Sequence, residues 1–105
     1  MSFKKKRVLC LCATSLGTSG YFAEAVKTIA KELKADVETI KMQTSGRVIE
    51  NYVERMGYPD FVVGSPYASI RKRFPPEVPV VDGIPFLTGI GKEKAIKEVK
   101  EQLQK

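Results

Sequence analysis

Four short apolar segments alternate with segments of helical periodicity, and this alternation constrains the fold more than any other feature of the chain. The apolar segments are typical of short buried strands and span Arg7–Cys12, Asp36–Met42, Asp60–Gly64 and Val78–Gly83. Strands that alternate with helices are joined by crossovers, which favour a parallel sheet covered on both faces. We therefore predict an α/β fold, a three-layer α/β/α sandwich of Rossmann-like or flavodoxin-like type. Its four-stranded parallel sheet is expected to have the order 2-1-3-4.

Apolar residues at spacings of three and four mark the inward faces of three helices. These faces consist of Phe22, Val26, Ile29 and Leu33, then Ile49, Tyr52, Val53 and Met56, and finally Ile96, Val99 and Leu103. The second helix has possible caps at Thr44 or Ser45 and is expected to end at Gly57. The segment Ser65–Phe74 indicates a helical turn or a short helix.

Length and charge limit the possible partners. The 105 residues predict a single domain, residues 1–105, with its own core. The net charge of +6 admits nucleic acid or acidic proteins as partners. The basic clusters Lys4–Arg7 and Arg71–Arg73 lack interleaved aromatic residues, so we interpret them as solvated surface and expect no nucleic-acid partner. The chain contains no histidine, and we expect neither a metal nor a cofactor.

The N-terminal segment and the cysteines indicate the compartment. The apolar run near the N-terminus is too short for a signal peptide or a membrane span, which predicts a cytoplasmic protein without direct membrane insertion. The two cysteines, Cys10 and Cys12, are two residues apart on one predicted strand. We expect them to point to opposite faces and not to form a disulfide.

The loop after the first strand carries the candidate chemistry. Ligands of parallel α/β folds bind at the carboxyl ends of the strands, where the strand order reverses, and Cys12 ends the first strand. We expect the next helix to begin near Ser19 or Gly20, where free amides and the helix dipole favour an anion and lower the pKa of a thiol. Cys12 is therefore the candidate nucleophile. The predicted phosphate-binding loop consists of Ala13, Thr14, Ser15, Leu16, Gly17, Thr18 and Ser19.

Plainer interpretations apply to the same residues. A buried cysteine is often only a small hydrophobe, which is our interpretation of Cys10, and hydroxyls before a helix are usually caps. A Walker-type loop is absent from the sequence. A phosphatase of the Cys-x5-Arg kind needs an arginine where this chain has Thr18. A thiolate in an anion-binding loop without arginine favours acceptance and onward transfer of a phosphoryl group.

At this point the sequence resembles a known family, the IIB components of the sugar phosphotransferase system (PTS), and most closely the galactitol-type IIB proteins. Cys12 followed by Thr18 and Ser19 matches the spacing of the family's phosphocysteine loop. The second stretch of similarity starts at Val78 and rests on Gly83, Pro85, Phe86, Gly89 and Gly91. Galactitol-type loops usually have glycine directly after the cysteine, whereas this chain has Ala13.

The resemblance implies a phosphoryl relay. A phosphohistidine on a IIA partner would phosphorylate Cys12, which would pass the group to galactitol or a related polyol held by the membrane IIC permease. The protein would then be cytoplasmic and peripheral to the membrane through IIC, with a face around Cys12 that docks both partners. The expected rim residues are Leu16, Tyr21, Ser65, Tyr67 and Phe86, and the run Arg71–Arg73 is a candidate for electrostatic steering.

Two alternatives from other classes remain open at the level of sequence. A non-catalytic, anion-binding regulatory module could keep the same fold without turnover. A redox or phosphatase-like enzyme could also use the cysteine. Transfer from a phosphohistidine donor distinguishes the relay from the regulatory module, and hydrolysis of an aryl phosphate distinguishes the relay from a phosphatase.

Overall fold

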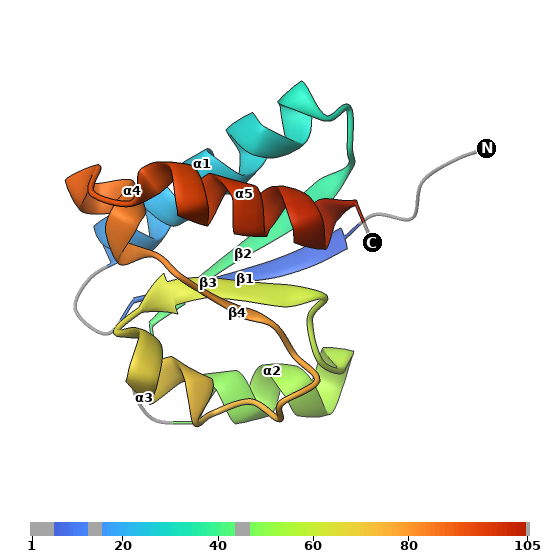
Figure 1. Ribbon diagram of the computed structural model, residues 1–105. Coiled ribbons are helices and arrows are strands. Elements are labelled where there is room, and N and C mark those ends of the chain that lie inside the picture. The colour runs from blue at the N-terminus through green and yellow to red at the C-terminus, as the bar shows by residue number, and fades with distance from the viewer. Residues whose placement is uncertain (1–5, 13–15, 44–46, 105) are drawn as a thin grey trace.

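A four-stranded parallel sheet forms the centre of the molecule. The computed structural model describes residues 6–12, 16–43 and 47–104. The strands are β1 (Lys6–Cys12), β2 (Val37–Gln43), β3 (Phe61–Ser65) and β4 (Val80–Asp82). They pair in parallel in the order β2-β1-β3-β4, which confirms the predicted fold class and strand order (Figure 1).

Helices cover both faces of the sheet and complete the three layers. Helices α1 (Leu16–Glu32), α4 (Ile84–Thr88) and α5 (Lys92–Leu103) lie on one side, and α2 (Val48–Met56) and α3 (Tyr67–Arg71) on the other (Figure 1). Each side has its own buried cluster, the first around Phe22, Val26 and Val99 and the second around Ile49 and Ile70. None of the helices in the described ranges is long and apolar enough to span a membrane.

The two faces of β1 follow the two-residue period of a strand. Val8, Cys10 and Cys12 belong to the cluster under α1, whereas Leu9 and Leu11 belong to the cluster over α2. The expectation that the two cysteines point to opposite faces is wrong, because side chains two positions apart on a strand share a face. Cys10 and Cys12 do not form a disulfide bond.

The predicted helical faces are confirmed in the first and last helices and in part of the second. Phe22, Val26 and Val99 are fully buried. In α2, Ile49 is buried, but Met56, the last residue of the helix, is 53% exposed. Gly57 ends α2 with a φ of 81°, as expected.

The start of α2 differs from the prediction. Its N-cap is Arg47, whose side chain makes no capping hydrogen bond. Thr44 and Ser45, the residues expected to cap this helix, lie outside the described residues and precede the observed N-cap. The Arg47 side chain therefore does not supply the acceptor that a serine or threonine cap gives to the N–H groups of the first turn.

Candidate active site

The last residue of β1 occupies the point where the strand order reverses. The chain leaves β1 towards β2 on one side and returns to β3 on the other. Cys12 pairs with Gln43 of β2 and with Ser65 of β3. It therefore lies at the carboxyl edge of the sheet, in the position where ligands of parallel α/β folds bind.

Helix α1 begins four residues after Cys12, at Leu16, rather than near Ser19 or Gly20. The predicted role of Ser19 as a cap is therefore wrong, because this residue is already the fourth of the helix. Gly17 and Gly20 weaken the helical signal in the sequence and explain the late prediction. The first four N–H groups of a helix have no acceptor within it, so the free amides here belong to Leu16–Ser19.

The predicted phosphate-binding loop is described only in part. Ala13, Thr14 and Ser15 lie outside the described residues. Leu16, Gly17, Thr18 and Ser19 form the first turn of α1, but their side chains also lie outside the described part. The hydroxyl donors of this loop therefore stay a prediction, whereas the helix start beside Cys12 is observed.

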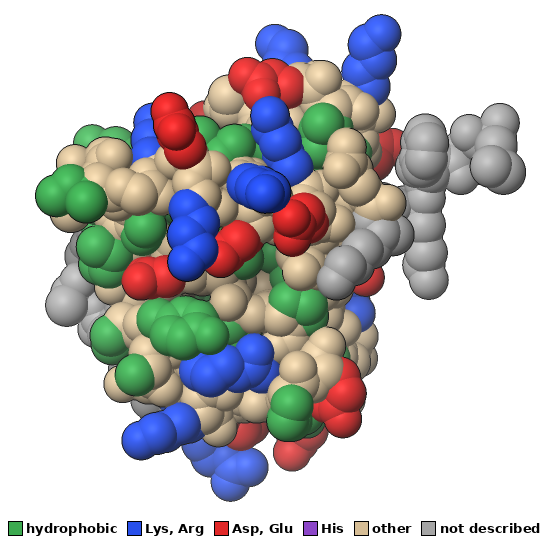
Figure 2. All heavy atoms as spheres, in the orientation of Figure 1, with side chains coloured by type: hydrophobic (Ala, Val, Ile, Leu, Met, Phe, Trp, Pro, Cys, Tyr) green, Lys and Arg blue, Asp and Glu red, His purple; other side chains and the backbone are tan. Residues whose placement is uncertain are grey.

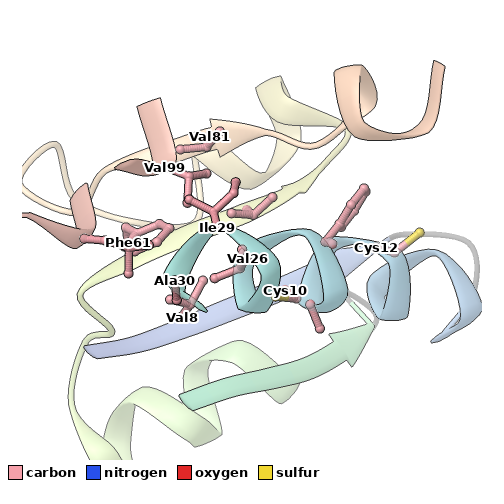
Figure 3. Packing of buried hydrophobic residues seen from close by; sticks show 13 residues of the cluster. Val8, Cys10, Cys12, Val26, Ile29, Ala30, Phe61, Val81 and Val99 are labelled. Atoms are coloured by element: carbon pink, nitrogen blue, oxygen red, sulfur yellow. The ribbon is translucent and has the colours of Figure 1, made fainter. Parts of the chain in front are cut away.

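The two thiols are both buried, with exposed fractions of 0% for Cys10 and 3% for Cys12. Burial raises the pKa of Cys10 to about 12, although the ammonium groups of Lys27 and Lys41 partly oppose this increase. Such a thiol stays protonated near neutral pH, which makes Cys10 a small core residue. In Figure 3, Cys10 lies beneath α1 near Val26, and Cys12 lies at the far end of the row, beside the start of α1.

Two glycines allow the chain to pack closely next to Cys12. The N–H of Gly83 donates a hydrogen bond of 2.8 Å to the carbonyl oxygen of Gly64. A Cβ atom on Gly64 would lie 2.9 Å from the carbonyl oxygen of Leu11, and one on Gly83 would lie 2.6 Å from the ring of Phe22. Both positions therefore require glycine, and they bring the ends of β3 and β4 against β1 and α1.

The segment after β4, where the sequence analysis predicted no helix, forms the short helix α4. Asp82 accepts a hydrogen bond of 3.0 Å from the N–H of Ile84 at the start of this helix. Pro85 lies in the first turn and Gly89 ends the helix with a φ of 84°. Proline near the start and glycine just past the end are a usual helix signature, so the sequence contained a signal for α4.

Exposed apolar side chains surround the carboxyl edge of the sheet. Among the predicted rim residues, Tyr21 is 68% and Tyr67 41% exposed, Ser65 is partly exposed, and Phe86 is partly buried against the cluster under α1. The side chain of Leu16 lies outside the described part. Sequence analysis missed the exposed residues Ile84, Leu87 and Ile90. Figure 2 shows hydrophobic side chains gathered where Figure 1 places α4.

The arginines of the two basic clusters make structural contacts. Arg71 donates hydrogen bonds to the carbonyl oxygens of Val78, at 2.7 Å, and of Pro75. Arg73 forms a salt bridge of 3.0 Å with Glu50.

The Glu50 carboxyl and the Arg7 guanidinium also make structural contacts. The pKa of the Glu50 carboxyl is held below its usual value by its own backbone N–H and by the Arg73 guanidinium. Arg7 donates hydrogen bonds to the Tyr52 hydroxyl and the Tyr58 carbonyl. The interpretation of these arginines as solvated surface is wrong. Arg7 and Arg73 connect segments far apart in the chain, and Arg71 holds the turn that follows α3.

Across residues 6–12, 16–43 and 47–104, no group of three cysteine or carboxylate side chains could hold a metal ion. The chemistry available near Cys12 is therefore that of a thiol, the free amides of a helix start and the backbone of a closely packed sheet edge. Such a site can bind an anion and stabilise charge on a transferred group.

Comparisons with known proteins show which family and which fold this chain shares. A family model described as "PTS system, Lactose/Cellobiose specific IIB subunit" matches residues 7–98. No curated protein matches the chain. A solved structure, the lactose-specific IIB component domain of the phosphoenolpyruvate:carbohydrate phosphotransferase system from Streptococcus pneumoniae, aligns with a TM-score of 0.54 and 22% sequence identity, covering 96% of this chain and 93% of that chain. At this identity the alignment shows a shared fold.

Proposed function

The chain belongs to the family of lactose/cellobiose-specific IIB subunits of the PTS, and from this premise we propose that Cys12 is the residue that carries the phosphoryl group. As a IIB component, the protein takes part in a sugar phosphotransferase system. In the proposed relay, the phosphorus–nitrogen bond of a IIA phosphohistidine breaks as a phosphorus–sulfur bond forms on Cys12. The phosphorus–sulfur bond then breaks as a sugar hydroxyl takes the group, and the hydroxyl proton passes to water.

The observation that supports this proposal is the position of Cys12 at the switch point of the sheet, four residues before α1 begins. The free amides of Leu16–Ser19 and the positive end of the α1 dipole would stabilise both a thiolate and the transferred phosphoryl group. Ala13, Thr14 and Ser15 complete the proposed phosphate-binding loop. Transfer needs positioning and charge stabilisation rather than an acid or base, which suits a chain without histidine.

The second thiol supports the choice of Cys12. Cys10 lies on the same face of the same strand, but burial raises its pKa to about 12. Its thiolate is therefore scarce near neutral pH. The proposal assigns Cys12 a lowered pKa through the helix start, which the interior position of Cys10 does not provide.

The exposed apolar rim supports docking of two proteins in succession. Tyr21, Tyr67, Ile84, Leu87 and Ile90 are all at least 40% exposed and belong to elements or turns next to the carboxyl edge. We assign this rim to transient contacts with the IIA donor and then with the IIC permease. The protein would thus associate with the cytoplasmic side of the membrane through IIC.

The sugar itself stays a proposal. The matching family model describes lactose/cellobiose subunits, and neither comparison supports the galactitol-type subfamily. Galactitol or a related polyol is proposed only from the resemblance of the Cys12 loop and the Gly83–Gly91 segment. A transport assay with the cognate IIC permease should compare galactitol, lactose and cellobiose as acceptors, since the permease binds the sugar.

The central experiment incubates the protein with phosphoenolpyruvate, the general PTS proteins and candidate IIA proteins. Mass spectrometry of the peptide that contains both cysteines should find one phosphoryl group, and fragmentation should place it on Cys12. The Cys10→Ser variant is the matched control and should be phosphorylated like the wild type. Anion binding without any phosphoryl transfer would instead indicate the regulatory module, and hydrolysis of an aryl phosphate would indicate a phosphatase.

A further inference from the structure

A groove of about 280 Å³ lies between helix α1 and the edge strand β2. Its lining consists of Gly20, Tyr21, Ala23, Glu24, Lys27 and Lys41. Tyr21 belongs both to this groove and to the exposed rim around Cys12. Lys41 pairs with Cys10 in the sheet, so the groove extends from the first turns of α1 towards the middle of β2.

The two lysines of the groove come from different elements and converge on one space. Lys27 lies on α1 and Lys41 on β2, and both side chains are exposed. In the described part of the chain, neither ammonium takes part in an ion pair or a hydrogen bond. Glu24 lines the same groove, also without an ion pair in that part of the chain, so the groove keeps a net positive charge.

Gly20 is not required by the packing of α1. Glycine inside a helix is unfavourable compared with alanine. At Gly64 and Gly83 a Cβ atom would collide with neighbouring atoms, whereas at Gly20 it would meet nothing within 4 Å. The missing side chain leaves the groove open at the end nearest the start of α1.

We propose that this groove, the Lys27–Lys41 groove, receives an acidic side chain of the IIA donor when that protein docks over Cys12. The two ammonium groups are its counter-ions, and Tyr21 connects it to the apolar rim. A basic chain of net charge +6 suits an acidic partner surface. Tyr21 makes the groove continuous with the apolar rim, which favours an acidic side chain of a docking protein over a free phosphate ion. The inference rests on the proposed function only for the identity of the docking protein.

The direct test uses a short acidic probe rather than a partner. An acetylated hexaglutamate peptide is titrated into the isotope-labelled full chain at low ionic strength, and backbone amide shifts are followed by nuclear magnetic resonance. We expect the shifts to concentrate at Gly20, Tyr21, Lys27 and Lys41. Inorganic phosphate is titrated separately, and we expect it to bind this groove more weakly than the peptide does.

Charge variants give effects of opposite sign. Lys27→Gln/Lys41→Gln should raise the dissociation constant of the peptide about fivefold, whereas Glu24→Gln should lower it about twofold. The matched control, Lys94→Gln/Lys97→Gln, removes the same charge from exposed positions of α5 and should change the constant by less than about twofold. The wild-type pattern of shifts in each free variant checks its fold, and Lys27→Gln alone serves if the double variant does not fold.

Equal effects of the two double variants would overturn the inference, as would peptide-induced shifts outside α1 and β2 or tighter binding of phosphate in the groove. With a phosphorylated IIA donor, the groove variant should need about fivefold more donor for half-maximal transfer, at an unchanged maximal rate. A wild-type chain that accepts no phosphoryl group would contradict the proposed function, while the peptide titration would still decide on the groove.

Discussion

Cys10 and Cys12 belong to the same strand, face the same cluster and are both buried, yet they differ in what lies ahead of them along the chain. Cys10 has strand residues on both sides and packs beneath α1 (Figure 3). Cys12 is the last strand residue, and the free amides of α1 begin four residues later. The comparison teaches that two thiols with the same burial can lie in different surroundings. In the proposed mechanism, the electrostatic field at the end of the strand decides which of them reacts.

The two cysteines also differ in the packing that surrounds them. The interior of β1 is held by aliphatic packing between strands and helices. The edge at Cys12 is held by backbone contacts, in which Gly64 and Gly83 replace side chains. Substitutions at the edge should therefore affect function and stability together, and substitutions of Cys10 should affect stability alone.

The largest expected effect is the loss of phosphoryl transfer when an oxygen atom replaces the sulfur of Cys12. Cys12→Ser should abolish phosphoryl transfer from a IIA donor, whereas Cys10→Ser should transfer at close to the wild-type rate. The hydroxyl is a far weaker nucleophile than a thiolate at neutral pH. Rapid-quench measurement of the phosphorylated chain checks this, and transfer through the Cys12→Ser protein would refute the mechanism.

Alkylation compares the two thiols without any partner. Iodoacetamide near neutral pH should modify Cys12 at least about tenfold faster than Cys10, because the rate follows the thiolate fraction. Phosphorylation should protect Cys12 from the reagent. Peptide mass spectrometry over time measures both rates in one sample. Equal labelling of the two cysteines would contradict the proposed difference in their electrostatic surroundings.

The first turn of α1 provides the third test. Since Ser19 is the fourth residue of α1 and not its cap, Ser19→Ala should leave the unfolding free energy nearly unchanged. A proposed hydrogen bond to the phosphoryl group predicts transfer that is about tenfold slower. Thermal unfolding and transfer rates on the same preparation separate the two effects. A loss of stability with an unchanged transfer rate would show that Ser19 has a purely structural role.

Packing at the edge can be tested with two glycines of one chain. Gly83→Ala should reduce the unfolding free energy by about 1 to 3 kcal/mol, because its Cβ atom would press on Phe22. Gly20→Ala, where a Cβ atom meets no neighbour within 4 Å, should instead stabilise the protein by about 0.5 to 1 kcal/mol. Urea denaturation measures both. Similar changes for the two variants would contradict the close packing at the edge.

The smallest expected effect is a change in pH dependence. The Cys10 pKa is raised from its ordinary value of 9.0 to about 12, so folding binds this proton more tightly. That contribution to stability is complete below about pH 9 and is lost as the pH rises towards 12. The unfolding free energy of the wild type should therefore fall more steeply over this range than that of Cys10→Ala. Lys27 and Lys41 are present in both proteins, and parallel curves would argue against the raised pKa of Cys10.

Much of the fold was predictable because its signals are local. Apolar runs and helical spacings indicate which segments are strands and helices, and short, right-handed crossovers leave few sheet orders. The place of Cys12 at the carboxyl edge followed from the same reasoning. The start of α1 and the existence of α4 were missed, because glycine and proline near a helix end are compatible with either a loop or a helix.

The sequence by itself determined the parallel sheet, its order and the position of Cys12, since these follow from periodicity and chain connectivity. Only the tertiary structure decided which charges are structural and which are free. Arg7 and Arg73 bind partners more than twenty positions away, at Tyr52 and Glu50. Lys27 and Lys41 line one groove and have no ion-pair partner among the described residues. The physical reason is that periodicity is a property of neighbouring residues, while burial, ion pairing and pKa depend on groups that the fold brings together from distant parts of the chain.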